Sequence, residues 1–253
     1  MAKLRITKSL VPNLLTLVNL YAGFSAIVYI SKGDIEKGAL FILIAAIFDM
    51  LDGVMARLIN ATSEFGAELD SLCDVVSFGV APSFMLYQVF FVNYNEIGIL
   101  FAALPALAGA SRLARFNIQL TDMIEDKQYF KGLPIPSAAL TIVSYIIFIL
   151  PNNYISESMT VIATFALVIF VAYAMISDIR FDNIPRPNKK SFRERPVVSI
   201  IFAIGMIASV ISKGIFVFPF MVFYIVASAI RHLIRFFQMD VEPEEEIDDA
   251  EEN

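Results

Sequence analysis

Long apolar segments recur along the whole chain, and they constrain its fold more than any other feature of the sequence. A helix needs about 20 mainly apolar residues to cross the hydrocarbon core of a bilayer. The chain has 253 residues, of which 58% are hydrophobic, whereas soluble domains average about 45–50% apolar residues. The sequence therefore predicts an all-α fold, a polytopic integral membrane helix bundle with most of its length in lipid.

The apolar segments predict about eight transmembrane helices. These lie at residues 10–30, 38–58, 69–92, 97–115, 133–150, 159–177, 197–212 and 214–234. Basic residues favour the cytoplasmic side of a membrane. With the N-terminus inside, 16 Lys and Arg residues fall on the inner side and three on the outer side. Both the N- and C-termini are therefore predicted to be cytoplasmic.

A single transmembrane domain is expected from residue 1 to residue 238, with a catalytic core at about 10–180 and two extra helices at about 197–236. Residues 239–253 form an acidic tail, and positions 240–253 carry nine acidic and no basic side chains. Such a composition favours a solvated, disordered segment. Without these nine acids the chain has 19 basic and 16 acidic residues, so the tail alone makes the net charge negative.

Four aspartates stand at the ends of two neighbouring apolar segments: Asp49, Asp52, Asp70 and Asp74. Carboxylates close to a bilayer core are costly, so they indicate a functional site. A helix advances about 100° per residue, which places Asp49 and Asp52 on one face of the second span. Asp70 and Asp74 likewise share a face of the third span. A short loop joins the two spans, so these faces are expected to meet near the cytoplasmic side.

The chemistry of this cluster favours a hard divalent cation. Carboxylate oxygens suit Mg²⁺ or Mn²⁺, and a pair of such ions about 3.5–4 Å apart is a known arrangement for displacement at phosphorus. Gly53, Ala56 and Gly66 lie on the same two faces and leave room for a ligand or for close backbone approach. Arg57 is placed to pair with a phosphate. Isolated aspartates at span ends are often only interfacial caps, but two aligned pairs are less easily explained that way.

The run from Asp49 to Asp74 fits the pattern D-x2-D-G-x2-A-R-x8-G-x3-D-x3-D. Its fixed positions are Asp49, Asp52, Gly53, Ala56, Arg57, Gly66, Asp70 and Asp74. This pattern resembles the signature of the CDP-alcohol phosphotransferase family. The strings PNLLT at 12–16, SFGVAP at 77–82, RLARFN at 112–117 and GLPIP at 132–136 resemble the phosphatidylserine synthase branch of that family.

The resemblance implies an enzyme that transfers a phosphatidyl or archaetidyl-type group from CDP-diacylglycerol, or its ether-lipid equivalent, to an alcohol, releasing CMP. It implies that Asp49, Asp52, Asp70 and Asp74 bind two Mg²⁺ or Mn²⁺ ions, and that Asp74 is also the general base. It further implies a set of CDP-lipid contacts. These are Asn13, Thr16, Asp52, Gly53, Arg57, Thr62 and Ser63.

The resemblance to the synthase branch implies L-serine as the acceptor. Arg112 and Arg115 are predicted to bind the serine carboxylate, with Lys131 and the basic loop at residues 186–195 as rivals for that role. The alternative is that these cations only follow the positive-inside rule or hold anionic lipid headgroups. A sister enzyme that uses glycerol phosphate, inositol phosphate or another alcohol is an alternative. An aspartate-lined cation transporter is a further alternative, but its charges should be spread across the membrane depth. A non-catalytic lipid-binding scaffold is a third.

The expected setting is the cell membrane, with multiple spans and an active site that faces the cytoplasm. Membrane lipids are expected partners, and no nucleic acid is expected. The family resemblance also implies a homodimer, for which the small-residue stretch Ala102–Gly109 or the region at Gly79 offers a contact surface.

Overall fold

The computed structural model describes residues 9–59, 63–121, 129–152, 154, 156–182, 204–205, 207–209, 211–212 and 214–239. Within them the fold is helical, and seven helices are long and apolar enough to cross a membrane. The predicted polytopic helix bundle is therefore confirmed, and the protein is a multi-pass membrane protein. Most of the predicted span at 197–212 and the acidic tail after residue 239 lie outside the described residues.

The elements follow one another along the chain as short and long helices with two brief strands. The α-helices are α1 (Leu10–Ser31), α2 (Ile35–Leu58), α3 (Glu64–Asp74), α4 (Ala81–Val89), α5 (Asn95–Thr121), α6 (Ile135–Ser144), α7 (Glu157–Ile176) and α10 (Val217–Met239). The π- and 3-10 segments are η1 (Val75–Val80), η2 (Phe91–Tyr94), η3 (Tyr145–Ile149) and η4 (Leu150–Asn152), and the strands are β1 (Tyr129–Lys131) and β2 (Arg180–Asp182).

Local chemistry fixes where several helices begin. The Asp34 side chain accepts a hydrogen bond from the backbone N–H of Lys37 at the start of α2, and Ser63 accepts one from Gly66 at the start of α3. Such caps satisfy backbone donors that a helix start leaves free. Lys37 also forms a 2.7 Å ion pair with Asp34, and this hydrogen-bonded partner lowers the pKa of the Asp34 carboxyl.

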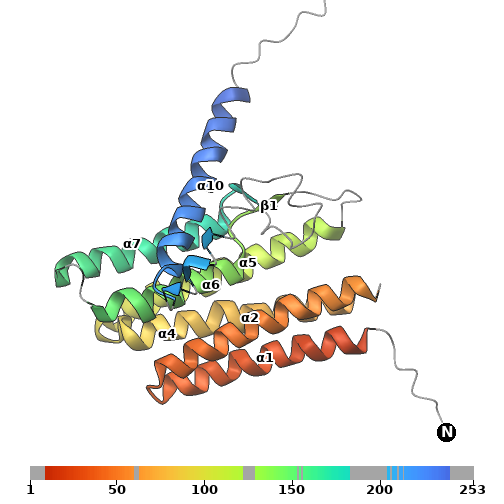
Figure 1. Ribbon diagram of the computed structural model, residues 1–253, viewed down its shortest axis with the longest axis horizontal. Coiled ribbons are helices and arrows are strands. Elements are labelled where there is room, and N and C mark those ends of the chain that lie inside the picture. The colour runs from red at the N-terminus through yellow and green to blue at the C-terminus, as the bar shows by residue number, and fades with distance from the viewer. Residues whose placement is uncertain are drawn as a thin grey trace, which may run out of the picture.

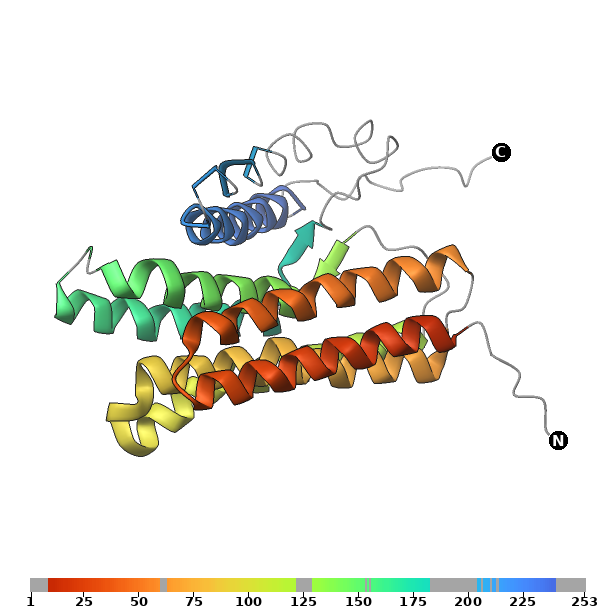
Figure 2. The same cartoon turned by 60° about the horizontal axis from the view of Figure 1, so that its bottom comes forward.

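Helices α1, α2, α4, α5, α6 and α7 run roughly along one common direction, while α10 crosses them steeply (Figures 1 and 2). Helix α1 packs on α2, α3 and η1, and α5 packs on α7. The start of α1 and the end of α2 lie at the same end of the bundle (Figure 2). This arrangement brings the Asp-bearing end of α2 beside α3.

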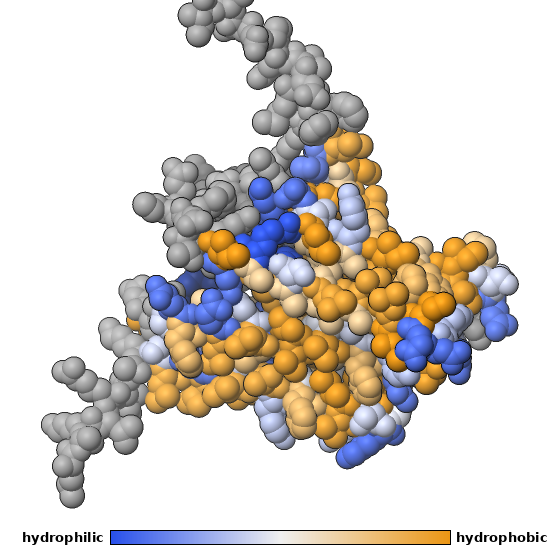
Figure 3. All heavy atoms as spheres, turned by 180° about the vertical axis from the view of Figure 1, so that it is seen from behind, coloured by the Kyte–Doolittle hydropathy of each residue, from blue (hydrophilic) through white to orange (hydrophobic). Residues whose placement is uncertain are grey.

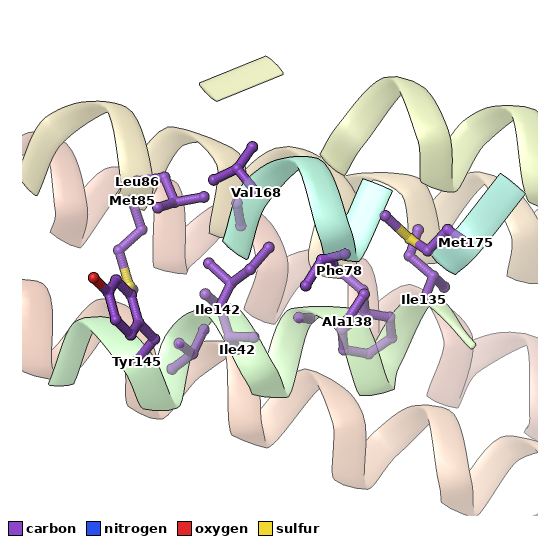
Figure 4. Close-up of a cluster of buried hydrophobic side chains, with 14 of the residues drawn as sticks. Ile42, Phe78, Met85, Leu86, Ile135, Ala138, Ile142, Tyr145, Val168 and Met175 are labelled. Atoms are coloured by element: carbon purple, nitrogen blue, oxygen red, sulfur yellow. The ribbon is translucent and has the colours of Figure 1, made fainter. Parts of the chain in front are cut away.

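The core of the bundle lies between α4, α6 and α7, with contributions from α2 and η1. Figure 4 shows the buried side chains strung along the interior of the bundle, with Met85 and Tyr145 at one end, Ile142 between, and Met175 at the other end. The outer surface is also apolar, as the broad orange areas of Figure 3 show. Large side chains such as Phe24 are 60% exposed, which is expected where lipid replaces water around the bundle.

A π-helical segment interrupts the third span directly after Asp74. The N–H of Ala81 reaches back five residues to the carbonyl of Val76. Pro82 follows at once and has no N–H to donate, so an ordinary helical ladder cannot continue through this point. Insertions of this kind are frequent at functional sites.

The two strands were not predicted, because the sequence around them reads as two polar cytoplasmic loops. They pair antiparallel, with Phe130 opposite Phe181. Gly132 follows β1 with φ of 77°, and its N–H donates to the carbonyl of Ile179 at 2.9 Å. The small sheet therefore ties the start of α6 to the end of α7.

Candidate active site at the meeting point of helices α1, α2, α3 and α5

The carboxylates of Asp49, Asp70 and Asp74 converge between α2 and α3. One oxygen from each lies within 4.8 Å of the other two. Asp52 also belongs to this end of α2, where it is only 5% exposed and lies in electrostatic range of Asp70. The predicted meeting of the two acidic faces is therefore found in the structure.

The environment of these carboxylates fits a hard cation. Asp74 is 6% exposed, and two buried oxygens, Oδ2 of Asp52 and Oδ1 of Asp70, have no hydrogen-bond partner. Unpaired buried carboxylate oxygens are costly, and several carboxylates at this spacing repel one another. A divalent ion bound among them would supply the missing ligands and offset the repulsion.

A pocket of about 190 Å³ opens beside the cluster, between α1, α2 and the start of α3. Its polar lining includes six of the seven predicted CDP-lipid contacts; the seventh, Thr62, lies outside the described residues. The lining residues are Pro12, Asn13, Thr16, Asp52, Gly53, Ala56, Arg57, Ser63, Gly66, Ala67 and Asp70. One face of this pocket is therefore acidic, and Arg57 brings a cation to it.

Gly53 leaves part of that pocket open. A Cβ added at this position would have the Arg57 guanidinium nitrogen as its nearest neighbour, at 3.5 Å. This is an ordinary contact distance, so the helix packing itself does not require glycine here. The missing side chain instead provides room inside the pocket.

Comparison with known proteins decides the family. A family model described as CDP-alcohol phosphatidyltransferase matches residues 9–175. The chain belongs to the CDP-alcohol phosphatidyltransferase family. The match runs from α1 to the end of α7, so it includes all four aspartates and every residue of the pocket. Helix α10 lies beyond it.

Curated relatives are similar over most of the chain. The CDP-diacylglycerol–serine O-phosphatidyltransferase of Helicobacter pylori is 39% identical over 175 residues, which cover 69% of this chain and 72% of that protein. The protein of the same name from Methanocaldococcus jannaschii is 34% identical over 218 residues, or 86% and 92% of the two chains. The archaetidylserine synthase of Methanothermobacter thermautotrophicus is 34% identical over 175 residues, or 68% and 70%.

Arg112 of this family member is buried on α5, with 7% exposure. Its Nε atom has no hydrogen-bond partner, and the guanidinium lies in electrostatic range of the Asp74 carboxylate and of a second cation, Arg115. A cation that merely obeyed the positive-inside rule would be expected at the membrane surface. The structure places this predicted residue close to the acidic cluster instead.

Arg115 and Lys131, predicted for the same role, have other neighbours. The Arg115 guanidinium donates to the backbone carbonyl of Ile176 at 2.8 Å, at the C-terminal end of α7, where a cation complements the helix dipole. Lys131 lies 3.9 Å from Asp178, and Arg115 lies 4.0 Å from the same carboxylate. Both side chains thus contact the turn that follows α7.

Sequence reasoning missed Asn19. This α1 residue is fully buried, and its Nδ2 donates to Oδ1 of Asp74 at 3.1 Å. One signal could have revealed it, because Asn13, Thr16 and Asn19 are polar residues spaced by three in an otherwise apolar span. Such residues in a membrane helix rarely face lipid.

A second polar contact joins α3 to α5. Asn117 donates to Ser71 Oγ at 3.0 Å and to Glu68 at 3.3 Å. Asn117 belongs to the RLARFN string, but its pairing across two helices could not be read from that string. The contact holds the Asp70-bearing helix against the helix that carries Arg112.

Proposed function

We propose that this protein transfers a phosphatidyl, or archaetidyl-type, group from a CDP-linked lipid to the hydroxyl of L-serine and releases CMP. The observation that carries this proposal is the convergence of Asp49, Asp70 and Asp74 beside a polar pocket. Relatives named CDP-diacylglycerol–serine O-phosphatidyltransferase and archaetidylserine synthase support serine as the acceptor.

Asp49, Asp52, Asp70 and Asp74 are assigned as the ligands of two Mg²⁺ or Mn²⁺ ions. Such ions, when bound, neutralise charge on the diphosphate and on the departing phosphate. The unpartnered oxygens of Asp52 and Asp70 support this assignment. Without bound ions, the unpartnered oxygens of Asp52 and Asp70 would remain buried with no hydrogen-bond donor.

The pocket beside the aspartates is assigned to the CDP portion of the donor. Arg57 pairs with phosphate oxygens, since a guanidinium presents several donors in a planar fork. Asn13, Thr16 and Ser63 offer neutral hydrogen-bonding groups along the pocket wall, and Thr62 precedes Ser63 in the same connection. The lipid tails stay in the surrounding bilayer throughout.

Asp74 acts as the general base. It accepts the proton of the serine hydroxyl, and the hydroxyl oxygen forms a bond to the β-phosphorus. The bond between that phosphorus and the oxygen of the leaving CMP breaks at the same centre. Such positioned proton transfer contributes about 10²- to 10⁴-fold in rate. A direct displacement of this kind inverts the configuration at phosphorus, and observed retention would rule it out.

Arg112 is assigned to the serine carboxylate. It is the predicted acceptor residue that lies buried near Asp74, and a buried guanidinium whose Nε has no partner favours an anionic ligand. Arg115 and Lys131, predicted for the same carboxylate, are here assigned to the turn at Asp178 that closes this side of the site.

The protein is placed in the cell membrane with the active site facing the cytoplasm, because most of its basic residues are then cytoplasmic. Residues 1–238 form one domain, with the acidic tail after it. A homodimer is proposed from the family resemblance alone. Crosslinking in native membranes tests that assembly.

The deciding experiment measures CMP release from CDP-diacylglycerol and from CDP-archaeol by the purified full-length protein. L-Serine, glycerol 3-phosphate, inositol 1-phosphate and myo-inositol are supplied in turn, with Mg²⁺, with Mn²⁺ or with a chelator. The expected result is release that requires both serine and a divalent ion. Release that depends on a sugar or glycerol phosphate would assign a sister activity instead, and release of no CMP with any acceptor would reject the enzyme assignment.

A further inference from the structure

The Asn19 side chain is half satisfied inside the site. Asn19 is fully buried. Its amide nitrogen Nδ2 donates a hydrogen bond to Oδ1 of Asp74 at 3.1 Å, whereas its own Oδ1 is buried without a partner. Leaving a buried acceptor unpaired is costly. A membrane helix that places such a group next to the catalytic base indicates a ligand that completes it.

The direction of the Asn19 amide follows from its neighbours. A flipped amide would set its oxygen against the Asp74 carboxylate, and two acceptors cannot share a hydrogen bond. The nearby Ser77 hydroxyl donates to the backbone carbonyl of Asn19 at 3.1 Å. The Asn19 Oδ1 is therefore an acceptor that no donor among the described residues satisfies.

We propose that Asn19 is a further residue of the acceptor site, where its Oδ1 binds the ammonium group of serine while its Nδ2 holds Asp74 in position. This role presupposes the serine transfer proposed above. L-Serine carries three polar groups around one carbon, and three helices would each supply a partner. Arg112 of α5 binds the carboxylate, Asp74 of α3 takes the hydroxyl proton, and Asn19 of α1 accepts from the ammonium.

The match between donors and acceptors supports this assignment. Serine has two donor groups, its hydroxyl and its ammonium, and the site has two adjacent acceptors, Asp74 and Asn19 Oδ1. Serine has one anionic group, and the site has one buried guanidinium, Arg112, in electrostatic range of Asp74. Three separate contacts at one stereocentre also predict that L-serine is used in preference to D-serine.

The test compares two serine analogues that each lack one group. Ethanolamine has no carboxylate, and 3-hydroxypropionate has a hydrogen in place of the ammonium. Each is titrated as an inhibitor of serine-dependent CMP release by the full-length wild-type protein and by the Asn19→Leu variant. Because both analogues use the Asp74 contact, the difference between them isolates the contact to the ammonium.

We expect Asn19→Leu to weaken ethanolamine inhibition about tenfold more than 3-hydroxypropionate inhibition, which corresponds to the loss of one hydrogen bond to a charged group. The KM for serine should rise and kcat should fall, while the KM for CDP-lipid stays within about twofold of wild type. The Arg112→Lys variant should show the opposite order, with 3-hydroxypropionate affected more than ethanolamine.

Two further variants separate this role from simple packing. Ser77→Ala removes the hydroxyl that donates to the Asn19 backbone carbonyl. This variant should keep the wild-type ratio of the inhibition constants of the two analogues. Asn19→Ala repeats the Asn19→Leu measurement without added bulk, in case leucine prevents folding. Equal weakening of both analogues in the Asn19 variants would overturn the ammonium contact. A rise in the KM for CDP-lipid that matches the rise for serine would do the same.

These failures differ from a failure of the proposed function. If the wild-type protein releases no CMP with serine, the serine transfer itself is rejected, and this inference with it. If the wild type uses serine but the Asn19 variants weaken inhibition by the two analogues equally, only the role of Asn19 is rejected. A buried water would then occupy the Oδ1 position.

Discussion

Helix α1 approaches the third span closely at Gly23, one turn beyond Asn19. A Cβ built on Gly23 would lie 2.7 Å from the Cα of Ser77 and 2.8 Å from its Cβ. A backbone atom cannot rotate away, so Gly23→Ala has to push the two helices apart. An ordinary contact begins at 3.4 Å, and the separation must therefore grow by about 0.7 Å, an overpacking change that costs about 1–3 kcal/mol of stability.

The same displacement acts on Asp74, the proposed catalytic base. The Asn19–Asp74 hydrogen bond is 3.1 Å long, so adding most of this shift takes it beyond hydrogen-bonding range. A misplacement of about 1 Å at a reacting group costs about 10²-fold in rate. The shift at Gly23 is slightly smaller than this 1 Å misplacement. We therefore expect Gly23→Ala to lower kcat for CMP release by about 10- to 100-fold.

The assay measures kcat and the melting temperature of the detergent-solubilised protein together. Leu17→Ala serves as the matched control, because Leu17 is on the same helix but 45% exposed on its outer side; this variant should keep wild-type kcat. A Gly23→Ala protein with wild-type kcat and an unchanged melting temperature would refute the close approach and the positioning of Asp74 by α1.

Three substitutions and the removal of the metal test the pocket, the proposed base, the acceptor side and the ion site. Gly53→Ala should raise the KM for CDP-lipid about tenfold at an unchanged melting temperature, since its Cβ fills pocket space without a clash; a large loss of stability would contradict this. Asp74→Asn should keep nucleotide binding, measured by calorimetry with CDP, but lose about 10²- to 10⁴-fold in kcat; substantial remaining turnover would remove Asp74 as base. Arg112→Ala should raise the KM for serine far more than the KM for CDP-lipid, and equal increases would exclude it from the acceptor site. Chelation should stop CMP release and lower the melting temperature, and added Mg²⁺ or Mn²⁺ should restore both, because an ion bound only to the folded state stabilises it.

The acidic cluster could be predicted because its geometry is mostly local. Residues three or four apart share a helix face, so the spacings of Asp49 with Asp52 and of Asp70 with Asp74 fix their directions on each helix. A short connection then makes those two helices neighbours. The seven spans found within the described residues follow from the same local information, since length and hydropathy determine them.

The contacts that join distant helices could not be predicted in this way. Asn19 and Asp74 are 55 residues apart, and Arg115 and Ile176 are 61 apart. Nothing in the spacing of either pair indicates that they meet. The pairing of β1 with β2 is missed for the same reason, because it depends on α5 and α7 lying side by side.

Arg112 shows how burial changes the interpretation of a cytoplasmic cation. By sequence it could be one more residue that follows the positive-inside rule, yet a side chain with 7% exposure gains little from the membrane surface. Its nearby countercharge is Asp74. If Asp74 binds a divalent ion as proposed, that ion would draw on the same negative charge and would leave the Arg112 guanidinium without a full countercharge. An anionic acceptor would restore the balance, whereas an uncharged alcohol would not. We therefore expect serine to bind measurably more weakly to the chelated protein than to the metal-loaded protein.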